Sequence, residues 1–337
     1  MADRLRFGIL STGNIAQQFA AGVRGSRRCT LAAVASRAQG SADAFAQAQQ
    51  VGRAYGSYDQ LLADSEVDAI YIGLPNSMHH EWTIKALGAS KHVLCEKPIA
   101  SNQAQAAEMF EVARARGKVL AEAFMYRSHP QTKKLMETIK AGAIGEVRFI
   151  RTSFTYKTTR IAENIRFRPD LAGGALMDIG CYCIDFSQLI AGRAPSSVSA
   201  YAVLHQSGVD ELVAGAMQFP GGMLATFTCG MTAEANNSAQ ICGTAGYIEI
   251  PVPWKPAAGG AKFTIAYGIP PRMDGGAASK RPAPELVRVA ADDNVYSYEA
   301  DDFAAAVLDG AVPQMPAEST LSNMRILDEL RKQVGVL

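Results

Sequence analysis

A turn directly after the first apolar segment has the residues that dinucleotide binding requires. Residues 8–16 read GILSTGNIA and lead into a stretch with helical periodicity. Gly13 lets the backbone approach a pyrophosphate, Ala16 permits close packing of helix against strand, and the helix N-terminus supplies free amides. Ser11 stands where the fingerprint usually has its first glycine, so a simple strand-to-helix turn is the alternative. The predicted cofactor contacts in this turn are Ser11, Thr12, Gly13, Asn14 and Ile15.

The end of the second apolar run indicates which nucleotide is bound. Ser36 and Arg37 follow Gly13 by about two dozen residues, where NAD-binding chains carry an acid for the ribose hydroxyl. A hydroxyl and a guanidinium suit a ribose 2′-phosphate instead. The sequence therefore favours NADP over NAD. The alternative for Arg37 is a solvated arginine at a helix start.

The first part of the chain has the rhythm of a doubly wound α/β domain. Up to about residue 124, nearly continuous apolar runs alternate with helix-length segments, which predicts a parallel sheet covered by helices on both faces. The runs are RFGIL, LAAVAS, AIYIGL, HVLCE and KVLAEAF. We predict a dinucleotide-binding domain over residues 1–124.

After Tyr126 the pattern changes to consecutive β-rich runs joined by turns, which predicts a mainly antiparallel sheet in an α+β domain over residues 125–337. The runs are EVRFIRTSFTY, SSVSAYAVLH, ELVAGAMQF and MLATFTCG. A helix is expected from about Gly174 to Ile190, between the first two runs. Another helix, from about 318 to 334, has apolar residues at helical spacing and is expected to pack back on the first domain.

One segment of the second domain is predicted to be mostly loop. Residues 251–284 are rich in Pro, Gly and Ala, with one short strand expected around Phe263 to Tyr267. This segment could form either a lid or an oligomer contact, and the sequence does not decide between them.

Length and charge limit the classes of partner. The 337 residues suffice for two domains with separate cores. The formal net charge of +1 leaves no excess to neutralise a nucleic-acid backbone or an anionic membrane surface. No apolar stretch approaches the roughly 20 residues that span a bilayer. We expect a small-molecule partner, no nucleic acid and no membrane.

The cysteines indicate a reducing compartment. They form no C-x-x-C pair and lie in apolar segments, so we expect reduced, mostly buried thiols. Cys181 and Cys183 point to different faces of a predicted helix, so no metal site is expected. The apolar stretch at residues 5–10 is too short for the core of a signal peptide. These features predict a cytoplasmic protein.

Four further segments occur in order along the chain: LPNSMH at 74–79, KHVLCEKP at 91–98, AEAFMYR at 121–127 and GGALMDIGCY at 173–182. With them the chain resembles the Gfo/Idh/MocA family, named for glucose-fructose oxidoreductase, inositol dehydrogenase and rhizopine catabolism. Tyr182 replaces the histidine found in much of the family. This is similar to the branch of glucose-fructose oxidoreductase, sugar (xylose) dehydrogenases and dimeric dihydrodiol dehydrogenase.

The resemblance implies a Rossmann domain followed by an α/β domain whose open sheet often forms the subunit interface, so a homodimer through that sheet is expected. It also implies that Lys97, Asp178 and Tyr182 face the nicotinamide. In that role Tyr182 is the acid/base, the Lys97 charge favours its phenolate, and Asp178 orients the substrate hydroxyl or Lys97. The alternatives are a solvated lysine and a tyrosine packed in the core.

Other residues join these as candidate contacts. Asn76 follows Pro75 at the end of a strand, where such sheets bind ligands. His79 is expected either to contact the cofactor or to cap the helix that it opens. Arg166 and Arg168 resemble an R-x-R stretch of glucose-fructose oxidoreductase, with ordinary surface arginines as the alternative. The remaining candidates are Leu74 and Glu96 for the cofactor, Arg166 for either ligand, and Arg127, Phe154 and Tyr156 for the substrate.

Three functions are compatible with these residues. The first is oxidation of an aldopyranose at C1 to the lactone by NADP, with reduction of a second sugar if the cofactor stays bound. The second is a trans-dihydrodiol or dicarbonyl oxidoreductase. The third is a non-catalytic NADP-binding regulator, against which the acid/base set argues.

Overall fold

The computed structural model describes residues 4–268 and 282–337, so part of the predicted loop region, at 269–281, lies outside the described residues. The chain forms two compact units, and it returns to the first unit twice. The first unit comprises Met1–His129, Arg168–Gly173 and Asp293–Asp328; the second comprises Pro130–Phe167, Gly174–Asp292 and Glu329–Leu337. The chain thus first leaves the first unit after His129, a few residues beyond the predicted boundary at 124. The C-terminal segment that returns to the first unit, 293–328, begins well before the helix predicted from about 318.

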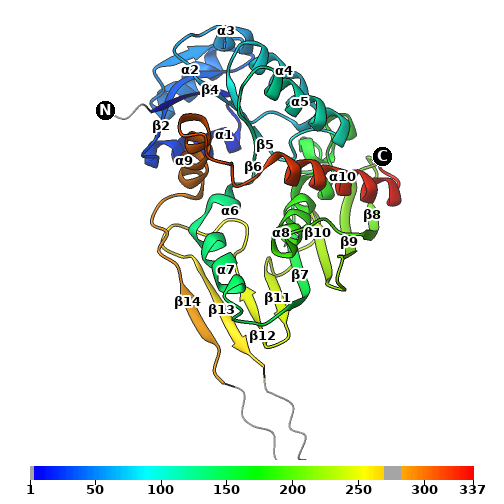
Figure 1. The fold of residues 1–337 in the computed structure, drawn as a ribbon. Coiled ribbons are helices and arrows are strands. Elements are labelled where there is room, and N and C mark those ends of the chain that lie inside the picture. Colours follow the sequence, from blue (N-terminus) through cyan, green and yellow to red (C-terminus); the bar gives the residue numbers. More distant parts are fainter. Residues whose placement is uncertain (1–3, 269–281) are drawn as a thin grey trace, which may run out of the picture. The chain divides into compact units, whose positions relative to one another are not determined.

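The first unit is built on a six-stranded parallel sheet with the order β3-β2-β1-β4-β5-β6 (Figure 1). This is the Rossmann order, in which the strand order reverses between β1 and β4 and ligands bind beyond the carboxyl ends of these strands. The strands are β1 Leu5–Leu10, β2 Cys29–Ala35, β3 Arg53–Tyr55, β4 Ala69–Ile72, β5 His92–Glu96 and β6 Leu120–Ala123. The helices are α1 Asn14–Gly25, α2 Gln39–Gln49, α3 Tyr58–Leu62, α4 His79–Gly88, α5 Gln103–Ala115, α6 Met125–Ser128 and α9 Val295–Leu308.

The helix α9 was not predicted, although it completes the core of the first unit. Phe303 of α9 packs on Phe7 of β1 at 5.7 Å between ring centroids, and Phe7 lies 5.3 Å from Phe19 of α1. A β-carbon added at Gly22 of α1 would lie 2.4 Å from Cβ of Tyr296. This close approach of α1 and α9 explains why residues 293–328 belong to the first unit.

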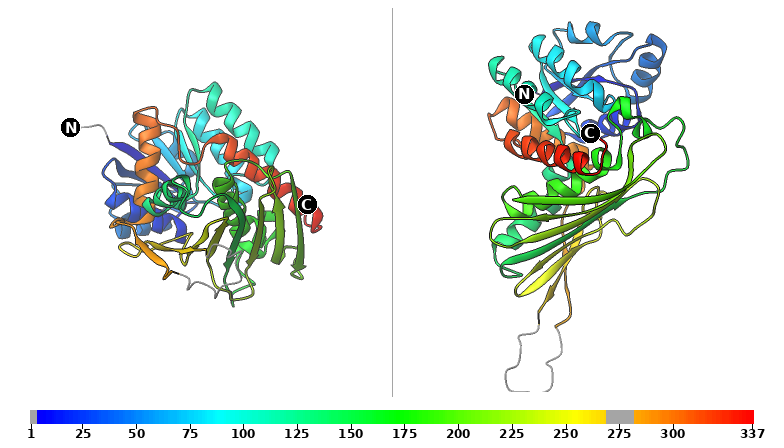
Figure 2. Two further views of the ribbon diagram at one scale, coloured as in Figure 1. Left: turned by 60° about the horizontal axis from the view of Figure 1, so that its bottom comes forward. Right: turned by 90° about the vertical axis from the view of Figure 1, so that its right-hand side faces the viewer.

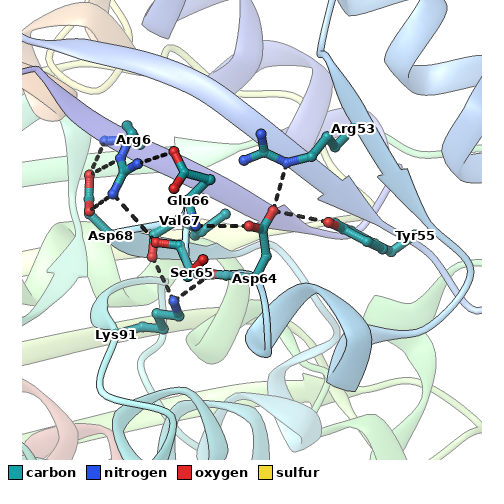
Figure 3. Close-up of polar contacts among 9 residues, drawn as sticks. All are labelled: Arg6, Arg53, Tyr55, Asp64, Ser65, Glu66, Val67, Asp68 and Lys91. Atoms are coloured by element: carbon teal, nitrogen blue, oxygen red, sulfur yellow. Dashed lines mark hydrogen bonds and ion pairs between the residues drawn. The ribbon is translucent and has the colours of Figure 1, made fainter.

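A polar network holds the chain between α3 and β4 at the amino-terminal edge of the sheet (Figure 3). The Arg6 guanidinium donates to both carboxylate oxygens of Asp68, at 2.8 and 2.7 Å. Lys91 is 7% exposed and its Nζ donates to the carbonyl oxygens of Asp64 and Val67, each at 2.7 Å. These bonds fix the edge of the sheet opposite the cofactor turn.

The second unit carries an eight-stranded sheet with the order β14-β13-β12-β11-β7-β10-β9-β8, and α8 lies on one face of it (Figures 1 and 2). Only β7 and β10 pair in parallel. The strands are β7 Val147–Thr155, β8 Ser197–Leu204, β9 Asp210–Gln218, β10 Leu224–Gly230, β11 Ala239–Gly243, β12 Gly246–Ile250, β13 Lys262–Tyr267 and β14 Glu285–Arg288. The helical segments are α7 Pro130–Lys140, η2 Ile165–Phe167, the π-helical turn η4 Leu176–Gly180 and α8 Cys181–Ala191.

The predicted fold class is confirmed: a Rossmann unit and a unit with a mainly antiparallel sheet. The strands β3, β11, β12 and β14 were missed, and the predicted helix after Gly174 begins with a π-helical turn. The C-terminal helix α10, Ala317–Gln333, is close to its predicted bounds, and Asp328 is the last of its residues in the first unit. Five of the six cysteines are buried, in agreement with the prediction of mostly buried thiols. Within the described ranges, no helix has the length and apolar character needed to cross a membrane.

Replacing Lys91 with Ala is expected to lower the free energy of unfolding by about 1–3 kcal/mol, because two carbonyl groups lose their donor. Urea denaturation measures this change. Lys118→Ala is the matched control, since within residues 4–268 and 282–337 the Lys118 side chain forms no hydrogen bond; we expect a change below about 0.5 kcal/mol. Wild-type stability of Lys91→Ala would contradict the role of this network.

Candidate functional site

The turn after β1 has the geometry of an anion cradle. Ser11 has a φ of +131°, a conformation that favours glycine, and its Oγ accepts a hydrogen bond from the N–H of Gly13 at 3.0 Å. Gly13 is the N-cap of α1 and makes no side-chain cap bond, so the first amides of this helix are open to a ligand. The serine therefore takes the conformation of the usual glycine, and the turn fits a nucleotide pyrophosphate.

The end of β2 presents the pair that was predicted to select NADP. The main-chain N–H of Ser36 donates to the carbonyl of Tyr55 at 3.0 Å, which fixes Ser36 beside β3. Arg37 is exposed at the start of α2, and in the described part of the chain its guanidinium has no hydrogen-bond or ion-pair partner. It is therefore available to a phosphate.

The turn after β4 is fixed by side chains that bind main-chain carbonyls. The Asn76 amide donates to the carbonyl of Ala172 at 2.9 Å. His79 is fully buried, with Nδ1 and Nε2 each 2.8 Å from the carbonyl oxygens of Pro98 and Leu74. Burial lowers the pKa of His79. His79 thus ties the turn after β4 to the Lys97–Pro98 turn, and the N-cap of α4 is Met78. The contact of His79 with the cofactor stays a prediction.

The carboxyl end of β5 carries Glu96 and Lys97. Glu96 is 7% exposed; its Oε1 accepts from the Tyr71 hydroxyl at 2.5 Å and its Oε2 from the N–H of Lys97 at 3.2 Å. The Lys97–Pro98 peptide bond is cis. Glu96 therefore anchors the backbone of Lys97 from within the unit, while the Lys97 side chain is only partly buried.

In the second unit, Asp178 binds two other residues that were predicted to contact a ligand, Tyr156 and Arg166. Its Oδ2 accepts from the Tyr156 hydroxyl at 2.8 Å and from Nε of Arg166 at 2.7 Å. Burial, followed by the Asp178 charge, raises the pKa of Tyr156, and Asp178 raises the pKa of Arg166. Tyr156 is thus a neutral donor and Arg166 a fixed cation, although 46% of the Arg166 side chain is exposed.

Tyr182 lies on α8 among aromatic rings. It is 4% exposed, its centroid is 5.3 Å from Phe154 in an edge-to-face arrangement, and Trp254 lies 6.0 Å away. Asp178 and then, more weakly, an ionised Tyr182 raise the pKa of Arg166, so Tyr182 lies within electrostatic range of Arg166. Aromatic packing and a polar role are combined in this residue.

These features agree with comparisons to known proteins. The model of the oxidoreductase family with an NAD-binding Rossmann fold matches residues 5–124, and the model of the GFO/IDH/MocA C-terminal domain matches residues 132–249. The chain belongs to the Gfo/Idh/MocA oxidoreductase family. The protein is therefore an oxidoreductase with a nicotinamide-nucleotide-binding Rossmann domain.

Individual Gfo/Idh/MocA proteins match almost the whole chain. A trans-1,2-dihydrobenzene-1,2-diol dehydrogenase from Xenopus laevis is 34% identical over 98% of both chains. The structure is similar to that of a 3-ketoreductase from Actinomadura kijaniata in complex with NADP and TDP-benzene, with a TM-score of 0.87, 29% identity and 98% of each chain covered. An aldose-aldose oxidoreductase from Caulobacter crescentus shares the fold, with a TM-score of 0.86, 22% identity and 98% of each chain covered.

Two of the arginines considered for ligand contact have partners within the protein. Arg127 is 6% exposed, and its Nη1 donates to the carbonyl of Gln314 at 3.2 Å in the interior of the first unit. Arg168 forms an exposed ion pair with Asp170 at 2.6 Å. These placements favour structural and surface roles, respectively, over substrate contact.

Trp254 belongs to the aromatic cluster around Tyr182, and the sequence did not reveal it. It was assigned to the loop region, yet it is 3% exposed and its indole N–H donates to the carbonyl of Ser153 at 3.1 Å. Its ring stacks on Phe154 at 5.6 Å and meets Phe186 edge-to-face. A lone tryptophan in a segment rich in Pro and Gly was the only available signal.

The strained position of Ser11 predicts a difference between two replacements. Ser11→Gly is expected to be more stable than Ser11→Ala by about 1 kcal/mol or more, because alanine keeps a β-carbon at positive φ and lacks the hydroxyl that accepts from Gly13. Thermal and chemical unfolding of the two variants measure this difference. Equal stability of the two would show that the backbone of the turn is not under this constraint.

Proposed function

We propose that this protein is an NADP-dependent oxidoreductase that moves hydride between the nicotinamide and a ring carbon bearing a hydroxyl. The observation that carries the proposal is the Asp178 carboxylate, held by Tyr156 and Arg166, with Tyr182 four residues further along the same helical segment. A buried carboxylate with two donors and a neighbouring phenol suits a substrate with hydroxyl groups, because each hydroxyl both donates and accepts hydrogen bonds.

The residues of the first unit fit NADP. The free amides at the start of α1 and the turn at Ser11 suit the pyrophosphate, and the unpaired Arg37 suits a 2′-phosphate. When bound, the nicotinamide supplies the acceptor or donor of a hydride. The complex of the ketoreductase relative with NADP supports this choice.

The chain's own residues are assigned to the proton and to orientation. Tyr182 takes the hydroxyl proton as the carbon loses hydride, and returns it in the reverse direction. Lys97 supplies the positive charge that favours the phenolate in this step. Asp178, with its charge shared by Arg166, accepts a hydrogen bond from a second substrate hydroxyl and so fixes the ring.

The preferred substrate is an aldopyranose oxidised at C1 to its lactone. Its C1 and C2 hydroxyls are adjacent on a six-membered ring, so Tyr182 receives the first while Asp178 receives the second. A tightly held cofactor is then restored by reduction of a second sugar. A trans-dihydrodiol is the second candidate, because it has the same adjacent pair of hydroxyls and the Xenopus laevis relative is named for such a substrate. A non-catalytic regulator has no need of the polar group around Asp178.

We further propose a homodimer through the open face of the second unit's sheet. Large side chains on this face are exposed: Tyr201 by 87%, Val203 by 52% and Leu224 by 45%. The register places Tyr201, Ala214 and Thr228 side by side, so these residues belong to one face. Self-association would bury this apolar surface. The mostly buried cysteine thiols, scattered through apolar segments, support the cytoplasm as the location.

Tyr182→Phe removes the proposed acid/base and is expected to lower kcat by about 100-fold or more, in the range that general acid/base groups contribute. Turnover is followed by NADPH absorbance, and NADP affinity by titration of protein fluorescence. NADP binding should be unchanged, because the turn that holds the nucleotide phosphates is intact. Tyr267→Phe, at the end of β13, is the matched control and should have the wild-type kcat. Wild-type turnover of Tyr182→Phe would remove this residue from the mechanism.

Arg37→Ala is expected to raise the Kd for NADP by about 10- to 100-fold, the size of one charge-assisted hydrogen-bonded contact. The Kd for NAD should be nearly unchanged, because NAD lacks the 2′-phosphate. Calorimetric titration of both nucleotides gives the ratio. Arg116→Ala, an exposed arginine at the end of α5, serves as the control. An equal loss of affinity for both nucleotides would contradict the 2′-phosphate assignment.

A further inference from the structure

Asp210 is a buried carboxyl group that the proposed reaction does not use. It is the first residue of β9 and is 1% exposed. Its Oδ2 accepts a hydrogen bond from the main-chain N–H of Leu176 at 2.6 Å. Leu176 is the first residue of the π-helical turn η4 that carries Asp178. The carboxyl group therefore holds the beginning of the helical segment on which Asp178 and Tyr182 lie.

The other oxygen of Asp210 explains the glycine that precedes this helix. Gly174 has a φ of +112°, and a β-carbon built on it would lie 2.1 Å from Oδ1 of Asp210. Oδ1 has no hydrogen-bond partner among the described residues, so it is the backbone of Gly174 that covers it. The second glycine of the Gly173-Gly174 pair is thus required both by its conformation and by the close approach of Asp210.

The turn held by Asp210 is connected to both charged partners of the site. The N–H of Gly174 donates to the carbonyl of Arg166 at 2.8 Å, and the N–H of Asp178 donates to the carbonyl of Gly174 at 3.0 Å. The side chains of Arg166 and Asp178 then meet at 2.7 Å. A shift of Gly174 would move the backbones of both residues, and with them the ion pair.

We infer that Asp210 is a positioning residue, whose carboxylate fixes the Gly174 turn and thereby aligns Asp178 with Arg166 and Tyr156. This inference rests on the proposed function for its effect on turnover, but the anchoring of the turn is independent of any substrate. The carboxylate suits this place because it is aimed at main-chain amides at the start of a helical segment, where negative charge is favoured.

The surroundings of Asp210 indicate the pH at which the anchor would weaken. Burial raises the pKa of Asp210 to about 6, against the opposing effects of the amides of Leu176, Asp210 and Ala175 and of the Arg331 charge on α10. Cys229 on β10 also faces Asp210, and burial keeps that thiol protonated by raising its pKa. Protonation removes the charge of Asp210, so the anchor is expected to weaken as the pH falls through about 6.

Asp210→Asn tests the inference, because it keeps the shape and removes the charge. We expect kcat to fall by about 10- to 100-fold, as for a small misplacement of catalytic groups, with NADP affinity unchanged. The wild type should lose kcat on the acid side with a midpoint near pH 6, and the variant should lack this dependence. Glu211→Gln, which changes the next residue of β9, is the matched control and should behave as the wild type.

Hydrogen–deuterium exchange of residues 174–182 gives a readout that needs no turnover. Asp210→Asn should speed exchange in this segment, while Lys97→Met should leave it unchanged. If the wild type turns over neither sugars nor diols, the proposed function fails, but faster exchange in Asp210→Asn still supports the anchor. Wild-type exchange in Asp210→Asn, or wild-type kcat and pH profile in an active enzyme, would overturn the inference.

Discussion

The buried negative charge of Asp178 is the constraint on which the second unit's polar group depends. A carboxylate that is 9% exposed is stable as an anion only if donors replace water. Tyr156 from the end of β7 and Arg166 from η2 supply these donors at 2.8 and 2.7 Å. Both must therefore reach the π-helical turn, and this requirement fixes where β7 ends and how the segment before Gly174 folds.

The first unit is under a different constraint, because it must present main-chain amides, rather than side chains, to the proposed nucleotide. The turn at Ser11 offers amides at a helix start, and interior side chains hold the neighbouring turns. The His79 ring lies between the carbonyls of Leu74 and Pro98 and, as a neutral imidazole, donates to one of them, while Glu96 accepts from the N–H of Lys97. Each of these polar groups is buried and bonded to main chain, so each keeps a loop in one conformation. We therefore interpret His79 and Glu96 as supports of the cofactor turns.

The sequence predicted the elements whose pattern is local. Continuous apolar runs identified β1, β2, β4, β5 and β6, and the glycine-containing turn identified the nucleotide site. The strands β11 and β12 were missed because they are short. The helix α9 was missed because it packs in the core of the first unit although it lies near the other end of the sequence, which local periodicity does not reveal. The hydrogen bonds of Asp178, the packing of Trp254 and the anchor at Asp210 depend on approaches over 12 to 101 residues. Residue spacing in a single sequence does not predict such long-range contacts.

The most direct test of the proposed activity is the nicotinamide fluorescence of protein loaded with NADP after addition of single candidate substrates. D-glucose, D-xylose, 2-deoxy-D-glucose and trans-1,2-dihydrobenzene-1,2-diol form the panel. We predict that the nicotinamide fluorescence rises with an aldopyranose. The rise should be smaller or slower with 2-deoxy-D-glucose, which lacks the hydroxyl assigned to Asp178. A rise with the diol alone would contradict the sugar assignment, and no rise with any of the four would contradict hydride transfer from a ring carbon that bears one of two adjacent hydroxyls.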